Sequence, residues 1–264
     1  LHPRKATGKP PATADRVRRY RHLDWCVLAD RLTDSKLYLT IRGGTTKVPH
    51  AHHDLLSFNC VVGSGADAEA MIVNLGMPEY LDTTFSPRRF EMFDAAACSK
   101  NTILINGVGH AHDAHVKTSL VKGAGWQGVL IDASDQMGTM RDGPVARQCL
   151  RLFALVRGKV AVVIDRVAVP QVARIGSRMY TYADVTWRRA AAVLRGGHQR
   201  MRVAYGATAD AQLHPSMAAP TTPRRPGGPR RGPAEPRAAR GAADRAAPAS
   251  MMRLITDRLV DCVT

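Results

Sequence analysis

The stretch of the sequence best equipped for chemistry is VPHAHHDLLSF, residues 48–58, where three histidines and an aspartate precede an apolar run. Imidazole and carboxylate groups are costly to bury without partners. In a strand, residues two apart share a face, so we expect His50, His52 and Asp54 to project together. That arrangement predicts a metal site of the Zn²⁺ type or a proton carrier beside a substrate carboxylate. The alternative is a polar strand end whose histidines are solvated or hydrogen-bonded.

Length and composition limit what must position these side chains. The chain has 264 residues, 45% of them hydrophobic, which suffices for one large β domain or two small ones. It contains no run of about eighteen apolar residues, so we expect no membrane-spanning helix. It begins with Leu and shows no secretory leader, and we interpret it as a fragment whose start is missing. The five cysteines form no CxxC pair, which fits neither a disulfide framework nor a zinc ribbon.

The formal net charge of +16 indicates a polyanionic partner. Much of that charge lies in the stretch 218–250, and aromatic residues that would stack on bases make up only 5% of the chain. Acidic polysaccharide therefore fits the charge at least as well as nucleic acid, which we consider the least favoured partner.

Short runs rich in β-branched and aliphatic residues follow one another with glycine-containing turns between them. These runs are KLYLTIR (36–42), DLLSFNCVV (54–62), AMIVNL (70–75), NTILING (101–107) and HVKTSLV (115–121). Two alternating runs around Arg157-Gly158, spanning 146–169, predict a β-hairpin. We predict an all-β protein with an antiparallel β-sandwich over residues 36–208.

The two ends of the chain have a different character. Residues 1–35 are predicted to be a connector with a short helix between 15 and 32. Residues 209–264 are dominated by Pro, Ala, Arg and Gly and are predicted to be disordered. Two explanations for this tail compete: a basic segment with a binding role, or a reading-frame artefact that replaced the end of the β domain. We favour the second because the strand pattern stops in mid-course.

Three blocks in order, GGTTKVPHAHHDLLSF, MIVNLGMPEYLD and SKNTILINGVGH, resemble the C-terminal β domain of heparinase II/III-like polysaccharide lyases. The resemblance covers residues 36–120 well and 146–187 more loosely. It implies a supersandwich-like β domain that follows an α-helical toroid, with the active site in the cleft between them. Such lyases cleave uronate-containing polysaccharide by β-elimination, which requires the substrate carboxylate to be neutralised. The resemblance also implies a periplasmic or secreted protein.

Carried over by position, the resemblance makes His50 the catalytic group that neutralises the carboxylate or accepts the proton. It places His52 at a zinc-ligand position, but the other two ligand positions hold Asn74 and Lys100 where the family has Asp and His. An amide is a weak Zn²⁺ ligand, and an ammonium group repels the ion. We therefore expect no cofactor, with the family's zinc site absent or severely weakened and Lys100 contacting Asn74 and His52 in place of the ion.

Three further residues are candidates for substrate binding: Tyr80, Arg88 and Arg89. A guanidinium fork matches a uronate carboxylate, so either arginine suits that role. The alternative is a solvated loop.

Two more polar groups have structural interpretations. GHAHDAH (109–115) follows a turn and is expected to be an exposed loop, with a second metal cluster as the alternative. The pair Asp165-Arg166 is expected to orient the end of the hairpin.

The sequence thus predicts a domain fragment of a polysaccharide lyase. Because the helical toroid would supply the rest of the cleft, we expect the chain to be inactive alone. The alternatives are a non-catalytic carbohydrate-binding or structural β-sandwich domain and, least favoured, a basic nucleic-acid-binding fragment.

Overall fold

The computed structural model describes residues 16–31, 33–76, 81–138, 146–170, 173–188, 190–207, 211–218 and 249–256. These residues form β-strands and short 3₁₀ helices, and every strand pair is antiparallel. The prediction of an all-β antiparallel protein is confirmed. None of the described helices has the length and apolar content needed to cross a membrane.

The first large sheet has the strand order β1-β2-β3-β5-β6. Its strands are β1 (Val17–Tyr20), β2 (Trp25–Ala29), β3 (Leu37–Arg42), β5 (Phe58–Val62) and β6 (Glu69–Ile72). Cys26 lies opposite Ile41 and Leu28 opposite Leu39, and all four are buried. Alternate residues of neighbouring strands thus supply one apolar face.

The second large sheet has the order β11-β10-β9-β8-β4. Its strands are β4 (Gly44–Thr45), β8 (His115–Gly123), β9 (Trp126–Asp132), β10 (Gln148–Val156) and β11 (Val160–Ala168). The predicted hairpin is confirmed: β10 and β11 are joined through Arg157 and Gly158, with φ of 51° and 67°. Two successive positive φ values are typical of the tight turn that matches strand twist.

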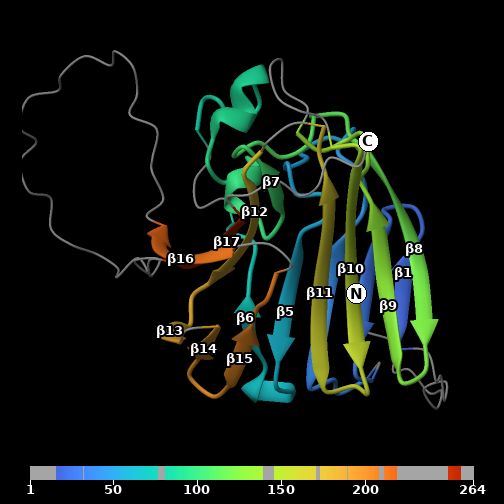
Figure 1. Cartoon of the computed structure of the whole chain (residues 1–264), viewed down its shortest axis with the longest axis vertical. Helices are drawn as coiled ribbons and strands as arrows, with labels where there is room; N and C mark the ends of the chain where they lie inside the picture. The colour runs from blue at the N-terminus through green and yellow to red at the C-terminus, as the bar shows by residue number, and fades with distance from the viewer. Residues whose placement is uncertain are drawn as a thin grey trace, which may run out of the picture.

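The two large sheets face each other and enclose the main hydrophobic core between them (Figure 1). Phe58 of β5 and Phe153 of β10 meet there with ring centroids 5.4 Å apart. Burying a side chain of this size contributes about 1.5–3 kcal/mol. Packing between the sheets therefore fixes the ends of β3 and β5, from which the candidate site is built.

Two smaller sheets complete the described structure. One has the order β16-β17-β12-β7, and the other β13-β14-β15. Their strands are β7 (Ile103–Ile105), β12 (Ile175–Thr181), β13 (Asp184–Arg188), β14 (Ala191–Arg195), β15 (Arg200–Ala204), β16 (Ala211–Ala218) and β17 (Ala249–Thr256).

Three 3₁₀ helices lie in the connections of the described chain. They are η1 (Gly65–Asp67), η2 (Pro87–Glu91) and η3 (Ala97–Ser99). The hydroxyl of Ser86 caps η2 by accepting a hydrogen bond from the backbone N–H of Arg88 at 3.2 Å. The cap starts η2 at Pro87, and Arg89 of this helix contacts the segment that carries His50.

The short helix predicted between 15 and 32 is wrong. This segment instead forms the antiparallel pair β1–β2, which extends the first sheet beyond β3. Cys26 and Leu28 point into the core two residues apart, which is a strand period. Pairing with β3 overrides the weak helical tendency of the segment.

Part of the predicted tail is also paired. The strands β16 and β17 lie within 209–264 and form a hairpin ladder in which β17 pairs with β12 from Ile175↔Thr256 onward. The proline- and arginine-rich stretch 219–248 lies outside the described residues.

Candidate functional site

Residues 48–57 form the feature that we call the histidine loop, which leads from a turn into β5. His50 has φ of +59° and Leu56 has φ of +63°, values that few non-glycine residues adopt. The backbone N–H of Ala51 donates to Val48 O at 3.4 Å, so the chain reverses at His50. The prediction that His50, His52 and Asp54 share one strand face is therefore wrong, because the strand starts only at Phe58.

Arg89 of η2 holds the tip of this loop. Its side chain is only 8% exposed. It donates from Nε to Ala51 O at 3.0 Å, from Nη1 to Thr84 O at 2.8 Å and from Nη2 to His50 O at 3.2 Å. Three carbonyls thus occupy the guanidinium that the sequence offered as a substrate ligand, and the structure uses it to fix the backbone of His50.

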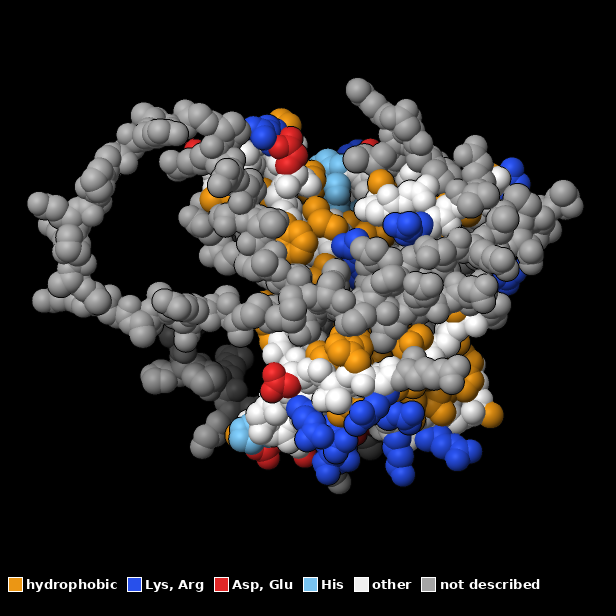
Figure 2. Space-filling model, turned by 60° about the vertical axis from the view of Figure 1, so that its left-hand side comes forward, with side chains coloured by type: hydrophobic (Ala, Val, Ile, Leu, Met, Phe, Trp, Pro, Cys, Tyr) orange, Lys and Arg blue, Asp and Glu red, His pale blue; other side chains and the backbone are white. Residues whose placement is uncertain are grey.

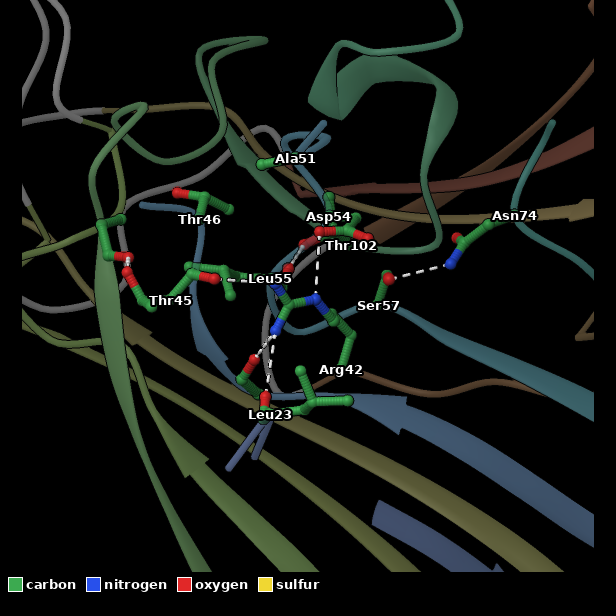
Figure 3. A network of polar contacts seen from close by, with 12 residues as sticks. Leu23, Arg42, Thr45, Thr46, Ala51, Asp54, Leu55, Ser57, Asn74 and Thr102 are labelled. Carbon is green, nitrogen blue, oxygen red and sulfur yellow. Dashed lines mark hydrogen bonds and ion pairs between the residues drawn. The ribbon is translucent and has the colours of Figure 1, made fainter. Parts of the chain in front are cut away.

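Arg42, the last residue of β3, holds the middle of the loop (Figure 3). Its Nε lies 3.4 Å from Asp54 Oδ1, and its Nη2 donates to Thr45 O at 2.7 Å. Burial raises the pKa of Asp54, and the Arg42 guanidinium opposes that rise. The pair anchors the loop to the end of β3, and Thr102 adds a hydrogen bond from its hydroxyl to Leu55 O at 2.7 Å.

Arg151 of β10 holds the end of the loop from beneath. It forms a bidentate ion pair with Asp165, at 2.6 and 2.7 Å, and donates from Nη1 to Leu56 O at 2.9 Å and to Asn101 O at 2.8 Å. Bidentate arginine–carboxylate pairs are the strong ones. Asp165 therefore orients Arg151, which supports the left-handed turn at Leu56 from the sheet below.

His50 itself is presented to solvent. Its imidazole lies edge-on to Phe85, with ring centroids 5.5 Å apart, and Phe85 is 70% exposed. Arg88 is also exposed and pairs with Glu91, from Nη2 to Oε2 at 2.7 Å. The backbone of His50 is fixed while its imidazole remains free to meet a ligand.

His52 and Lys100 are less exposed than His50. Burial, followed by the charges of Lys100 and Arg89, lowers the pKa of His52 to about 4, so its imidazole is neutral at pH 7. Lys100 is 2% exposed, and its Nζ donates to Leu75 O at 2.8 Å and to Asp94 O at 2.5 Å. Burial lowers the pKa of Lys100 to about 8, against the opposing charges of Asp54 and Asp94.

The residues aligned with the zinc ligands of the lyases that the sequence resembles do not fit the ion. Both ends of the Asn74 amide are hydrogen-bonded, since Nδ2 donates to Ser57 Oγ at 2.8 Å and Oδ1 accepts from the backbone N–H of Asn101 at 2.9 Å. The two hydrogen bonds of Lys100 go to carbonyls, and not to Asn74 and His52 as expected. Within the described ranges, no three His, Cys, Asp or Glu side chains are grouped to hold a metal. Lys100 instead puts a cation among backbone oxygens.

His110 is the residue that sequence reasoning missed. It was expected in an exposed loop, but it is 3% exposed, whereas His112 and His115 are exposed as expected. Its Nε2 accepts from the backbone N–H of Leu55 at 3.1 Å, so its proton resides on Nδ1, 2.8 Å from Ala111 O. Burial lowers its pKa to about 4, and the neutral ring acts as a fixed hydrogen-bond partner of the loop.

His53 packs against this support. Its ring stacks on Phe90 at 3.9 Å between centroids, with 5° between the planes, and lies 5.1 Å from the ring of His110. Burial lowers its pKa to about 3. Its backbone N–H donates to Ala95 O at 2.8 Å. Of the three histidines in the loop, His50 is exposed, and His52 and His53 are partly buried. Tyr80 lies outside the described residues.

We compared the sequence and the structure with those of known proteins. No protein-family model matches the sequence, and no curated protein matches it either. Solved structures do match: heparan sulfate lyase HepC from Pedobacter heparinus is 8% identical with a TM-score of 0.67, over 93% of this chain and 34% of that one. The crystal structure of heparinase III is 13% identical with a TM-score of 0.58, over 88% of this chain and 35% of that one. A second heparinase III structure has a TM-score of 0.59, at 9% identity, over 92% and 36%.

The chain has the fold of a heparinase III domain. The resemblance read from the three sequence blocks is thereby confirmed at the level of the fold. The chain spans about a third of the length of the structures that it matches.

The glycine pair of the first heparinase-like block has a steric reason. A Cβ on Gly43 would collide with Thr118 Oγ1 and with Asp24 O, and Gly44 has φ of +76°. The chain at Gly43 and Gly44 can thus pass close to Leu23, Asp24 and β8. The carbonyls of Gly43 and Thr45 accept hydrogen bonds from Arg42. In this heparinase-type domain, the Gly-Gly pair therefore serves the arginine that anchors the histidine loop.

Proposed function

We propose that the chain is the β domain of a polysaccharide lyase that cleaves uronate-containing polysaccharide by β-elimination. The observation that carries the proposal is the placement of His50. Its backbone is fixed by Arg89, and its imidazole is exposed beside Phe85. A positioned imidazole with free access is what general acid–base or electrostatic catalysis requires.

In this mechanism His50 acts on the substrate carboxylate or on the adjacent proton. Removing the proton beside a uronate carboxylate builds negative charge on that carboxylate, and donors placed around it lower the barrier. His50 is the histidine of the loop that can reach a substrate, because His53 is stacked on Phe90 and His52 is half-buried. The rest of the cleft would come from the helical toroid that the resemblance implies, so the chain alone is inactive.

Substrate binding is assigned to Arg88, with Tyr80 as a second group. The Arg88–Glu91 ion pair is exposed on both sides, and exposed pairs contribute only about 0–1 kcal/mol. A uronate carboxylate can therefore displace Glu91 at little energetic cost and take the guanidinium fork. Arg89 is left out of this role because three backbone carbonyls hold it.

The experiment is to express the chain together with the coding sequence upstream of it and to assay for unsaturated uronate by its ultraviolet absorbance. We expect product from the longer protein with an acidic polysaccharide and none from the 264-residue chain. A longer protein that binds polysaccharide and releases no unsaturated product would contradict the lyase proposal.

That contrary result would favour the second candidate, a non-catalytic carbohydrate-binding domain. The observation in its favour is the pair Asn74 and Lys100, which has departed from the family's ligand types. The two candidates differ in one readout: both bind acidic polysaccharide, but only the lyase shortens it.

A further inference from the structure

The small sheet β13-β14-β15 carries four arginines on one side, which we call the arginine face: Arg188, Arg195, Arg200 and Arg202. The registers align them. Asp184, Arg195 and Arg200 lie side by side, as do Thr186, Val193 and Arg202, and Arg188 lies opposite Ala191. Because side chains alternate along a strand, all four arginines point the same way.

The opposite side of this sheet serves the fold. Trp187, Leu194 and Met201 belong to or pack against the main core. The arginine side is exposed, and within the described chain none of its four guanidinium groups makes a hydrogen bond or ion pair. Figure 2 shows basic side chains gathered at the lower part of the molecule, the end where Figure 1 places these strands.

The arrangement of the charges destabilises the folded sheet when no ligand is bound. Arg195 and Arg200 are direct cross-strand partners, and like charges placed opposite each other are destabilising. Protection of exposed sheet edges accounts for charges on β13 and β15, but Arg195 lies on the central strand. On this face Asp184 supplies one carboxylate against four guanidinium groups, and Glu69 adds a second at the β14–β15 turn, where it accepts from the backbone N–H groups of His198 and Gln199. An anionic ligand would relieve this repulsion.

We propose that the arginine face binds a strand of acidic polysaccharide outside the catalytic cleft. This inference rests on the proposed function and adds to it a second holding site for the same substrate class. Guanidinium forks pair with carboxylate and sulfate groups in bidentate fashion. Between them lie the short side chains Thr186, Val193 and Ala204, which leave the guanidinium groups standing above a flat surface.

The composition of the face favours polysaccharide over nucleic acid. Single-stranded nucleic acid is held by aromatic side chains on which its bases stack. None of the outward positions of β13, β14 and β15 carries an aromatic residue, and Trp187 points to the core. The face is also remote from the histidine loop: Figure 1 shows β5 starting at the upper end of the sandwich and β13–β15 at the lower end.

The test compares two triple variants of the full chain that lose the same charge. One is Arg195→Ser, Arg200→Ser and Arg202→Ser. The control is Lys117→Ser, Lys122→Ser and Lys159→Ser, which removes exposed lysines of the second large sheet and its hairpin. The probes are heparin, hyaluronan and single-stranded DNA, with affinity measured by calorimetry at fixed salt.

We expect the arginine variant to bind heparin and hyaluronan about tenfold or more weakly than the native chain, since three exposed charge pairs are lost. The lysine control should change affinity less than twofold. Equal loss in both variants, no polysaccharide binding by the native chain, or tighter binding of DNA than of heparin would each overturn the proposal. Thermal unfolding of both variants checks that they are folded.

A His50→Ala variant of the longer protein separates this inference from the proposed function. It should lose cleavage, while the three arginine substitutions should still weaken its binding of long heparin chains about tenfold. Binding through the arginine face without any cleavage by the native longer protein would reject the lyase and support the binding surface. Cleavage that is insensitive to the arginine variant on long and short substrates alike would reject the binding surface.

Discussion

The guanidinium of Arg89 donates a hydrogen bond from Nη2 to the backbone carbonyl of His50, 3.2 Å away. His50 has φ of +59°, a left-handed conformation that is uncommon for residues other than glycine. The buried Arg89 therefore fixes the backbone of His50. The imidazole of His50 is exposed, and its position follows from that of the backbone. The same pair explains why adjacent arginines behave differently, because Arg88 is exposed and Arg89 is not.

Replacing Arg89 should destabilise the domain. Arg89→Met leaves the carbonyls of His50, Ala51 and Thr84 without their donor, and each unsatisfied buried group costs roughly 1–3 kcal/mol. We expect a loss of about 3 kcal/mol in the free energy of unfolding, measured by urea denaturation. The matched control, Arg88→Met, should change it by less than about 1 kcal/mol. Equal effects of the two substitutions would show that Arg89 does not fix the loop.

The Arg42–Asp54 pair should behave as a partly buried ion pair. Asp54→Asn leaves the guanidinium of Arg42 without its counter-charge, and losing a hydrogen-bonded charge of this kind costs about 1–3 kcal/mol. A double-mutant cycle with Arg42→Met should recover part of that loss, because the second change removes the stranded charge. Asp113→Asn, at an exposed position, is the control. Strict additivity of the two substitutions would argue against a direct interaction.

Because Lys100 occupies a zinc-ligand position, we expect the protein to bind no zinc. Its ammonium donates to Leu75 O and Asp94 O, and Asn74 offers an amide instead of a carboxylate. We expect purified native protein to hold no stoichiometric zinc by elemental analysis. The double variant Asn74→Asp and Lys100→His, which together with His52 supplies three competent ligand types, should acquire one zinc ion per chain. Stoichiometric zinc in the native protein would contradict this account.

The buried imidazole of His110 predicts loss of stability in acid. Its pKa is about 4 in the folded protein, and an unfolded histidine titrates near 6.5. Between these values the unfolded state binds more protons, so stability rises with pH there and falls as pH drops from about 6.5 towards 4. The full loss from this residue is about 3 kcal/mol. His110→Gln should flatten the acid limb of the stability profile, whereas His115→Gln should leave its shape unchanged.

The sequence predicted the fold where local signals were sufficient. The hairpin of β10 and β11 was found because two alternating runs flank Arg157-Gly158, whose backbone conformation favours a tight turn. The short helix was wrong because β2 pairs with β3 and β1 pairs with β2, contacts that no local pattern reveals. Propensity is a weak guide when tertiary pairing decides.

The site was predicted only in part, because it too depends on contacts between residues that are distant in sequence. The residue types of the histidine loop marked the right segment, but its turns at His50 and Leu56 depend on Arg89 and Arg151, which are distant in sequence. His110 stands among exposed histidines in GHAHDAH, so its burial had no periodic signature. The adjacent Gly109, where a Cβ would collide with Ala97, was the available signal of close packing.

The most direct test of the account is the activity of His50→Ala in the longer protein, measured as the rate of unsaturated uronate formation. Loss of a positioned acid–base group lowers a rate by about 10²–10⁴-fold, and we predict a loss in that range with the overall fold retained. His115→Ala, at an exposed position on β8, should keep the native rate. A His50→Ala protein that cleaves polysaccharide at the native rate would contradict the central claim.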